Sequence, residues 1–565
     1  MTDLTKLFKA MSALHVQTQE PLMVNPGDDY KFPFPQSYAG QDTVIREMKG
    51  FKQAALTSPT GTGKSAVVLS LTRDEATIVI EPRKFLQKQI SGYYDDYVLF
   101  GRSEYKCFHA VNAAKAPCNR KTECLTLTPE TKTIVPQDCV EEGTGASCDP
   151  DHPCKIFQTK QGAVKFPCRG CEYIGAQIEA KRTLQAKGTV ICNFGNFWPL
   201  LQQAKIVVID EADLFFREIA KPTKMMYSNK NDSEDSIKDL LTREMKGLDE
   251  AIKKTPANQA YTLQNLLYNV SFLLANADLC FKYQRRDKIY VEINPDNTNV
   301  LKDKIFKNKR LLIVSATLGE FNIPRYGYTV WQRRATYYCP VGKLTSKNLK
   351  ANPWIMGVAA ERIETITAVA EGMYDTHKFP IHCGNIGTHA TALNNLLGPD
   401  RKHLYCNVCG ERVEDISPEA QMVKCPKCGR KWEAREERCT MHKAGNLMQT
   451  IDTFVENDMR YLLIAGADYG GNFDWAKLQI ILKFPYGSLD EKMRVLERTM
   501  GKKKFNKYYV NEAISRFVQQ CGRTCRGFGD FGVTIVLDSK MMDVYRENPE
   551  SFPDWWKQTF DGKCY

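Results

Sequence analysis

A glycine-rich loop near the start of the chain has the residue types that hold phosphate groups. Residues 58–65 read Ser-Pro-Thr-Gly-Thr-Gly-Lys-Ser, between a strand-like run and a helix-like run. Glycines let the backbone N–H groups of such a loop point at phosphates, a lysine reaches the β- and γ-phosphates, and a serine hydroxyl binds Mg²⁺. The alternative is a plain glycine-rich turn, since Ser58 stands where such loops usually begin with glycine. We predict an ATP–Mg²⁺ site whose loop ligands are Thr60, Gly61, Thr62, Gly63, Lys64 and Ser65.

A pair of carboxylates follows a second buried strand. Residues 206–213 read Ile-Val-Val-Ile-Asp-Glu-Ala-Asp, and four β-branched residues in a row are typical of a central parallel strand. Open α/β sheets bind ligands at the carboxyl ends of their strands. We therefore expect Asp210 to hold Mg²⁺ and Glu211 to act as general base on the attacking water. The alternative, an acidic helix cap, is less consistent with a phosphate loop upstream.

A polar helix face near the end of the chain could supply charge from the opposite side. Within residues 516–526, Gln519, Arg523 and Arg526 recur at spacings of four and three, which places them on one face of a helix. Guanidinium groups on such a face can stabilise the charge that develops on a transferred phosphate. A solvated charged face is the alternative. Residues 311–318, Leu-Leu-Ile-Val-Ser-Ala-Thr-Leu, form another strand and a hydroxyl-bearing turn that could sense the nucleotide.

The 20 cysteines are clustered, which indicates metal sites in a chain without an export signal. Eight lie between Cys107 and Cys171. Four more form two Cys-x2-Cys pairs separated by fifteen residues, a spacing typical of tetrahedral zinc sites. We predict a zinc ribbon over residues 401–440, either a structural staple or a grip for nucleic acid or a protein partner. Its zinc ligands are Cys406, Cys409, Cys425 and Cys428.

Composition excludes several classes of protein. Apolar residues make up 43% and charged residues 25%, which suits a large globular chain rather than a disordered one. The sequence has no apolar run of membrane-spanning length and no signal peptide at its start, so we expect no membrane partner and no secretion. A net charge of +12 suits a polyanionic partner, although it is weak support by itself.

The ordered motifs resemble those of the XPD/DinG group of superfamily 2 helicases, with a phage-type member as one option. Residues 58–65 resemble motif I, 206–213 motif II, 311–318 motif III, 461–471 motif V and 516–526 motif VI. The segment IVIEPRKFLQKQ resembles motif Ia. Gln41 resembles the family's adenine-reading glutamine, and Asp468 lies in the motif V segment; we expect both, with Gln519, at the nucleotide.

Two departures from the family pattern bear on coupling rather than on nucleotide binding. Asp213 stands where the group usually has histidine, and Ala465 stands where it tends to carry glutamate. Both positions in the family help to couple hydrolysis to strand movement.

The resemblance also implies an iron–sulfur cluster in the first cysteine-rich segment. FGRSEYKC, which ends at Cys107, resembles the segment with the family's first cluster ligand, and the segment from Cys171 resembles the one with the last. Four thiolates hold a four-iron (4Fe–4S) cluster. We take Cys154 and Cys168 as the middle ligands, with Cys118 and Cys148 as rivals. A zinc-only insert, a second zinc site beside the cluster, and unliganded cysteines are the alternatives.

Together these features predict an α/β chain with two RecA-like parallel-sheet lobes and three inserts. The expected divisions are a loose leader at 1–30, motor lobe 1 at 31–106, 172–214 and 301–334, an iron–sulfur insert at 107–171, a helical arch at 215–300, and motor lobe 2 at 335–565, with the zinc ribbon inside it.

The expected function is an ATP-dependent DNA helicase, with 5′-to-3′ travel on single-stranded or forked DNA implied by the resemblance. We expect a monomeric, cytoplasmic motor, in the host cytoplasm if the chain is viral, and DNA repair is one pathway that uses such motors. One alternative is an ATP-gated nucleic-acid clamp or remodeller that does not unwind processively. Another is an interaction scaffold that works through the zinc ribbon.

Overall fold

The structure is a computed structural model of the whole chain. The residues that it describes are 4–16, 22–26, 30–59, 61–82, 84–101, 104–105, 126–127, 134–135, 157–158, 164–165, 172–219, 223–224, 235–254, 260–285, 288–317, 321–328, 333–345, 348–349, 352, 354–397, 404–405, 412–413, 422–424, 426–427, 429, 431–433, 439–441, 447–457, 459–465, 473, 475–525 and 530–565.

The first lobe is built on a seven-stranded sheet in which every pair of neighbours runs parallel. The strands are short and almost wholly buried, as continuous β-branched and leucine runs predict. In spatial order they are β16 (Arg325–Tyr326), β3 (Gln53–Thr57), β15 (Arg310–Ser315), β11 (Ile206–Asp210), β4 (Thr77–Ile80), β10 (Thr189–Cys192) and β5 (Tyr97–Leu99).

Helices cover both faces of this sheet, so that each face has its own apolar core. Helices α2 (Ala39–Met48), α3 (Lys64–Thr72) and α4 (Lys84–Ser91) contribute to one core. Helices α6 (Glu172–Gln185) and α7 (Ala212–Ile219) contribute to the other, and α10 (Thr298–Ile305) leads back into β15.

The second lobe repeats this plan with another all-parallel sheet of seven strands. In spatial order its strands are β23 (Cys439–Met441), β24 (Tyr461–Ala465), β18 (Phe379–Cys383), β25 (Leu478–Ile481), β26 (Phe531–Asp538), β17 (Arg333–Gly342) and β27 (Phe560–Cys564). Its helices are α12 (Ile355–Tyr374), α13 (Thr391–Leu396), α14 (Leu447–Glu456), α15 (Glu491–Met500), α16 (Lys502–Cys521), α17 (Lys540–Glu547) and α18 (Asp554–Lys557). Two parallel sheets covered by helices confirm the predicted α/β class and are consistent with two RecA-like lobes.

The arch segment is only partly helical, which corrects the prediction for residues 215–300. Two stretches of it do form helices, α8 (Ile237–Lys254) and α9 (Ala260–Ala275). They pack on a three-stranded antiparallel sheet of β12 (Thr223–Lys224), β14 (Lys288–Ile293) and β13 (Cys280–Arg285). The last two strands alternate apolar and polar residues with a period of two, which is a strand signal rather than a helical one.

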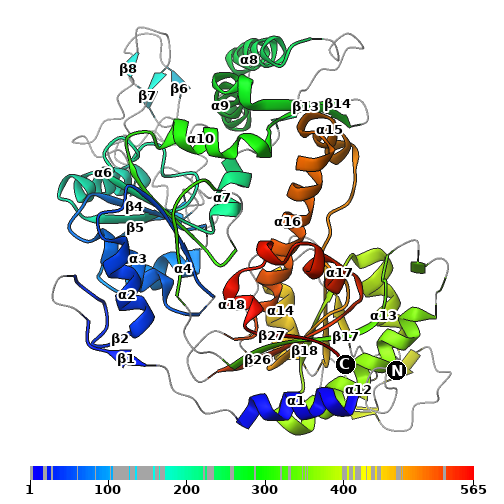
Figure 1. Cartoon of the computed structure of the whole chain (residues 1–565). Coiled ribbons are helices and arrows are strands. Elements are labelled where there is room, and N and C mark those ends of the chain that lie inside the picture. Colours follow the sequence, from blue (N-terminus) through cyan, green and yellow to red (C-terminus); the bar gives the residue numbers. More distant parts are fainter. Residues whose placement is uncertain are drawn as a thin grey trace.

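The arch segment, residues 215–300, is connected in sequence to the first lobe. It also contacts the second lobe. Helices α15 and α16 rise from the second sheet toward β13 and β14 (Figure 1). Phe281 and Tyr283 of the arch share a buried cluster with Leu496 and Phe505 of those helices. Because α16 is 20 residues long, roughly 30 Å, it spans from the arch back to the body of the lobe.

The first residues of the chain form a docked helix, so the predicted loose leader is wrong for this segment. Helix α1 (Leu4–Val16) lies against α12 and β17 of the second lobe (Figure 1). Leu7 and Met11 are fully buried there, and the Tyr337 hydroxyl donates to the carbonyl oxygen of Ala10 at 3.0 Å. The apolar side chains recur at helical spacing, which gives α1 a face to bury.

Short antiparallel strand pairs lie outside the larger sheets. Strand β1 (Met23–Val24) pairs with β2 (Ser37–Tyr38) beside α2. Two further antiparallel pairs lie within the first cysteine-rich segment: β6 (Thr126–Leu127) with β7 (Ile134–Val135), and β8 (Phe157–Gln158) with β9 (Val164–Lys165).

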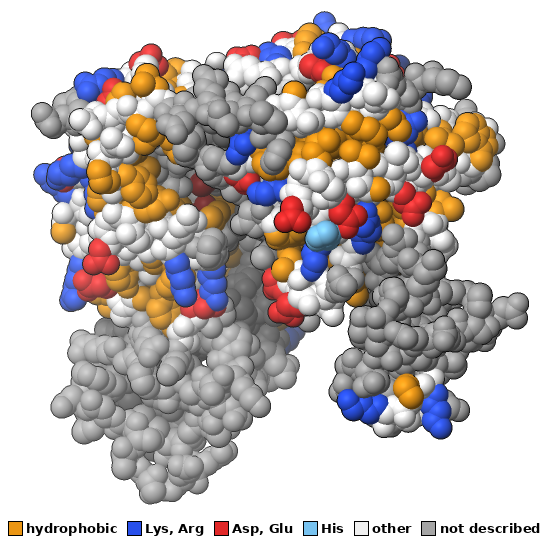
Figure 2. Space-filling model, turned by 90° about the horizontal axis from the view of Figure 1, so that it is seen from below, with side chains coloured by type: hydrophobic (Ala, Val, Ile, Leu, Met, Phe, Trp, Pro, Cys, Tyr) orange, Lys and Arg blue, Asp and Glu red, His pale blue; other side chains and the backbone are white. Residues whose placement is uncertain are grey.

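On the face seen from below, the charges of the described residues do not by themselves indicate a binding site. There, basic, acidic and apolar side chains are interspersed over the described atoms (Figure 2). The net charge of +12 is therefore not concentrated in the described part of that face. In the described part of the chain, no helix combines the length and apolar character needed to cross a membrane.

Candidate nucleotide-binding site

The phosphate-loop sequence lies where the prediction placed it, between strand β3 and helix α3. Gly61 and Gly63 have φ angles of 76° and 78°, in the left-handed region that glycine adopts without strain. The Lys64 ammonium group curls over the loop and donates to the carbonyl oxygens of Ser58 (3.1 Å) and Pro59 (2.9 Å). These two bonds hold the lysine above the loop. Thr60, another predicted ligand of the loop, lies outside the described residues.

Gln41 supports this loop from behind. Its side chain is buried, and its Nε2 donates to the carbonyl oxygen of Thr62 at 2.9 Å. Its Oε1 accepts from the backbone N–H of Tyr38 at 3.0 Å. A Cβ added to Gly63 would lie 2.6 Å from Gln41 Nε2, so a side chain here would displace the Gln41 amide from Thr62 and would also be strained at this φ angle. The adenine-reading role of Gln41 stays a prediction.

Tyr328 is a second support that the sequence did not indicate. Its hydroxyl donates to the carbonyl oxygen of Thr62 at 2.9 Å, and its backbone N–H donates to Ser58 Oγ at 3.1 Å. The second bond gives Ser58, which departs from the usual glycine, a specific role. Burial raises the pKa of the Tyr328 phenol, so the group stays a hydrogen-bond donor.

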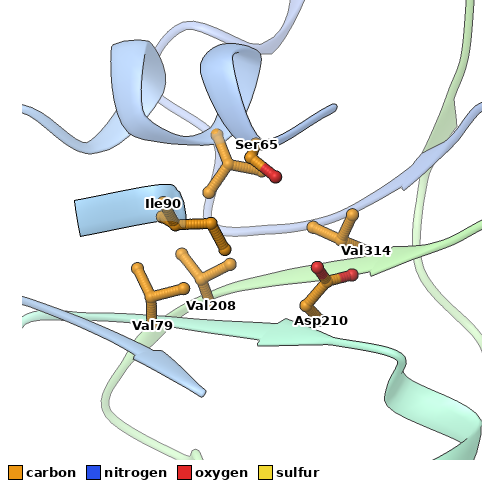
Figure 3. Close-up of a pocket in the computed structure, with 7 residues that line it drawn as sticks. Ser65, Val79, Ile90, Val208, Asp210 and Val314 are labelled. Atoms are coloured by element: carbon orange, nitrogen blue, oxygen red, sulfur yellow. The ribbon is translucent and has the colours of Figure 1, made fainter. Parts of the chain in front are cut away.

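The predicted acidic pair lies at the carboxyl end of β11. Asp210 and Ser65 line the same small pocket and point into it from β11 and from the start of α3 (Figure 3). The backbone N–H of Glu211 donates to Asp210 Oδ1 at 2.9 Å. Glu211 has a φ of 50°, unusual for a residue with a side chain, and such strain is common at functional sites. The hydroxyl and the carboxylate that should hold Mg²⁺ are therefore brought together.

Strand order brings distant segments to one sheet edge. Strand β15 lies between β3 and β11, so Ser315 pairs with Thr57 and Val314 pairs with Asp210. Within the turn that follows, Ser315 Oγ donates to the carbonyl oxygen of Thr317 at 2.7 Å. The phosphate loop, the acidic pair and the hydroxyl-bearing turn thus meet at the carboxyl ends of three neighbouring strands, where open sheets bind ligands.

The second lobe reaches this edge through α16. Gln519 Nε2 and Ser515 Oγ both donate to Thr317 Oγ1, at 3.0 Å and 2.9 Å. Gln519 therefore faces the first lobe, but the prediction of one helix face for Gln519, Arg523 and Arg526 is wrong, because α16 ends at Cys521 and Arg523 follows it. The partner of Gln519 is the hydroxyl-bearing turn.

Arg523 follows the end of α16 and lies buried in the second lobe. Its guanidinium carbon is 5.9 Å from the centre of the Phe473 ring. Burial and the nearby Arg523 charge lower the pKa of His382 to about 3, so that this histidine is neutral at ordinary pH. Arg526 lies outside the described residues.

Other predicted site residues also fall outside the described part of the chain. They are Asp468, the iron–sulfur candidates Cys107, Cys154, Cys168 and Cys171, and the zinc candidates Cys406, Cys409, Cys425 and Cys428. Among the residues that are described, no group of three or more His, Cys, Asp or Glu side chains is placed to hold a metal.

The strands around the zinc candidates are described, and they form two small hairpins. Strand β19 (Leu404–Tyr405) pairs with β20 (Arg412–Val413), and β21 (Met422–Lys424) pairs with β22 (Lys431–Glu433), both antiparallel. Each Cys-x2-Cys pair falls in sequence between the two strands of one hairpin. Gly429, after the second pair, has a φ of 71°.

Comparison with known proteins identifies one domain by sequence. Residues 432–559 match the family model of the helicase C-terminal domain, a stretch that includes α16 and most of the second sheet. No curated protein matches the sequence.

Several solved structures are similar to the chain at low identity. An XPD helicase has 11% identity and a TM-score of 0.49, over 90% of this chain and 97% of that chain. Xpd4 of S. tokodaii has 11% identity and a TM-score of 0.44, over 93% and 97%. The DUF1998 helicase MrfA bound to DNA has 10% identity and a TM-score of 0.38, over 97% and 58%.

Proposed function

We propose that this chain, in which residues 432–559 match the helicase C-terminal domain and whose motifs resemble those of the XPD/DinG group of superfamily 2, is an ATP-driven helicase that moves on single-stranded DNA. The observation that carries the proposal is the arrangement around β15. A phosphate loop with its lysine and a Ser65–Asp210 pair lie at the same edge of one sheet. A helix of the second lobe donates to Thr317 at that edge.

In the proposed mechanism the loop binds the triphosphate, with Lys64 on the β- and γ-phosphates. Ser65 and Asp210 would hold Mg²⁺, which neutralises charge on the phosphate oxygens. Glu211 orients and deprotonates the attacking water. Arg523 and Arg526 would approach the transferred phosphate from the second lobe, which requires the buried Arg523 side chain to reorient when the lobes close.

Lobe movement is the step that would do work on the strand. The contacts on Thr317 join the lobes at the nucleotide edge, so binding and hydrolysis can change their separation. We infer 5′-to-3′ travel and forked-DNA unwinding from the family resemblance. An ATP-gated clamp is the second candidate, because Asp213 and Ala465 replace residues that couple hydrolysis to movement in the family.

We also propose two metal centres in the inserts. Cys107, Cys154, Cys168 and Cys171 would bind a four-iron cluster, the preference of grouped thiolates in this family. The second cysteine group would bind zinc. Its support is the two antiparallel strand pairs, each of which has one Cys-x2-Cys pair between its strands in the sequence, the order expected of a zinc ribbon.

The test is ATP turnover by the full-length protein with and without single-stranded DNA or RNA. We expect DNA to stimulate turnover, and Lys64→Ala to lower kcat by about 100-fold or more. Lys246→Ala, an exposed lysine on α8, is the matched control and should behave as wild type. A forked duplex in the same reactions separates the candidates: strand release supports a helicase, and stimulated turnover without release supports the clamp. No nucleotide turnover under any condition would overturn both.

A further inference from the structure

A tryptophan near the end of the chain makes a contact between the lobes that the proposed mechanism has not used. The indole Nε1–H of Trp555, in helix α18, donates to the carbonyl oxygen of Ala316 at 3.2 Å. Ala316 lies between Ser315 and Thr317 at the nucleotide edge of the first lobe. We infer that Trp555 is a positioning residue that transmits the separation of the lobes to this edge; the inference rests on the proposed ATP-driven function.

Trp555 is held rigidly in the second lobe. Its side chain is 7% exposed and belongs to the same buried cluster as Phe517 of α16 and Trp556. A side chain locked by packing keeps its polar atom in place, whereas an exposed one loses that precision to rotamer freedom. The indole N–H group of Trp555 therefore moves together with the second lobe.

Trp555 also lies beside Arg334, which binds the backbone that follows α16. The Arg334 guanidinium carbon lies 5.6 Å from the centre of the Trp555 ring. Its Nη2 donates to the carbonyl oxygen of buried Cys525 at 2.6 Å. Cys525 directly precedes Arg526 in the sequence. The Trp555 ring thus contacts Ala316 in the hydroxyl-bearing turn of the first lobe on one side and Arg334 on the other. Arg334 in turn binds the backbone next to Arg526, the predicted arginine finger.

Trp555 also completes the junction that α16 begins. Ser515 and Gln519 donate to Thr317 Oγ1, and Trp555 donates to the preceding carbonyl oxygen. Three donors from one lobe therefore converge on two consecutive residues of the other. When the lobes separate, these three hydrogen bonds must either break or pull residues 316–317 along with the second lobe. Residue 316 directly follows Ser315, which pairs with Thr57 just before the phosphate loop.

The experiment compares Trp555→Phe with Trp556→Phe. The first variant keeps a ring near Arg334 but removes the donor to Ala316; the second makes the same change at the next residue, which is fully buried in the same cluster. For Trp555→Phe we expect DNA-stimulated kcat to fall about tenfold, KM for ATP to change less than about twofold, and the melting temperature to stay close to wild type. For Trp556→Phe we expect a lower melting temperature and an unchanged kcat. Equal effects of the two variants, or a wild-type kcat in Trp555→Phe, would overturn the inference.

A second measurement does not depend on turnover. Incorporation of 5-fluorotryptophan gives one ¹⁹F resonance for each of the seven tryptophans, and the one missing from Trp555→Phe identifies Trp555. We expect this resonance to shift when Mg–ADP or a non-hydrolysable ATP analogue is added, while that of Trp556 stays in place. A shift without ATP hydrolysis would show that the junction responds to the nucleotide, but would overturn the proposed ATP-driven function. Hydrolysis with an unmoved Trp555 resonance would overturn the inference and leave the proposed function standing.

Discussion

The Tyr328 hydroxyl donates a hydrogen bond to the carbonyl oxygen of Thr62 across 266 positions of sequence. Gln41 donates to the same oxygen from the opposite end of the lobe's sequence. The phosphate loop therefore has two buried donors that fix one of its carbonyls. Their effect is to hold the loop in the shape that phosphate binding requires, because a fixed carbonyl restricts the neighbouring N–H groups.

Tyr328→Phe is expected to weaken ATP binding without removing activity. The variant keeps the buried ring and the backbone bond to Ser58, but leaves Thr62 with one donor fewer. We expect KM for ATP to rise about three- to tenfold, in line with the loss of one buried hydrogen bond, and kcat to change little. Tyr326→Phe, on the neighbouring strand β16, is the control with no expected effect. An unchanged KM in Tyr328→Phe would show that the loop does not need this support.

The parts of the site that could be predicted are those encoded in short stretches of sequence. The buried runs that end before Ser58 and at Asp210 became parallel strands β3 and β11 on either side of β15, and strand direction then placed the phosphate loop and the acidic pair at one edge. Gln519 does lie on a helix that faces the first lobe, but the helix ends at Cys521, so the helical spacing predicted for Arg523 did not hold.

The contacts that were missed depend on partners far away in the sequence. Nothing around Tyr328 or Trp555 marks them out, because a tyrosine or tryptophan in an apolar stretch most often belongs to the core. Helix α1 was missed for a similar reason: its apolar face is short, and it folds against a lobe whose sequence begins about 300 residues later. The β13–β14 hairpin does have a local signal, an alternation of apolar and polar residues with period two, which contradicts the helical expectation for this part of residues 215–300.

His382 is expected to make stability depend on acid pH. Burial and Arg523 lower its pKa from 6.5 to about 3, and its Nε2 bonds to Gln479 at 3.1 Å. Between those two values the unfolded chain binds a proton that the folded chain does not, so stability falls as pH falls. In this range the free energy of unfolding falls by up to about 1.4 kcal/mol for each pH unit. Above the pKa of the unfolded chain, His382 adds no pH dependence.

His382→Gln provides the measurement. The variant should be less stable than wild type at pH 7, and the difference in unfolding free energy should narrow between pH 6 and 4 because glutamine does not titrate. A gap that stays constant across this range would mean that His382 is not held neutral.

Removal of one predicted zinc ligand should release metal from the second lobe insert. Cys425→Ser leaves three thiolates for an ion that needs four ligands, so bound zinc should fall by about one per chain while iron content is unchanged. Cys564→Ser, at an exposed cysteine near the end of the chain, should retain both metals. Full zinc content in Cys425→Ser would remove the zinc ribbon from the proposal and leave the motor site unaffected.

The contact between the arch and the second lobe should be energetically coupled through one ion pair. Lys492 Nζ lies 2.5 Å from Glu292 Oε2, and the carboxylate is almost buried. The Tyr283 hydroxyl donates to the other carboxylate oxygen at 2.6 Å, which orients it. A pair with this burial and a fixed carboxylate should exceed the coupling of a surface pair.

A double-mutant cycle with Glu292→Gln and Lys492→Met isolates this coupling. Glutamine keeps an acceptor for Tyr283, and methionine keeps the apolar stem, so the cycle removes mainly the charges. We expect a coupling of about 1–2 kcal/mol in unfolding free energy, against about 0.3 kcal/mol for the exposed Arg182–Glu179 pair. Helix α16 packs against the arch at one end and contacts Thr317 through Gln519 near the other. We therefore expect the double variant to unwind less duplex for each ATP that it hydrolyses. A coupling no larger than the surface pair, with normal strand release, would show that the arch moves independently of the second lobe.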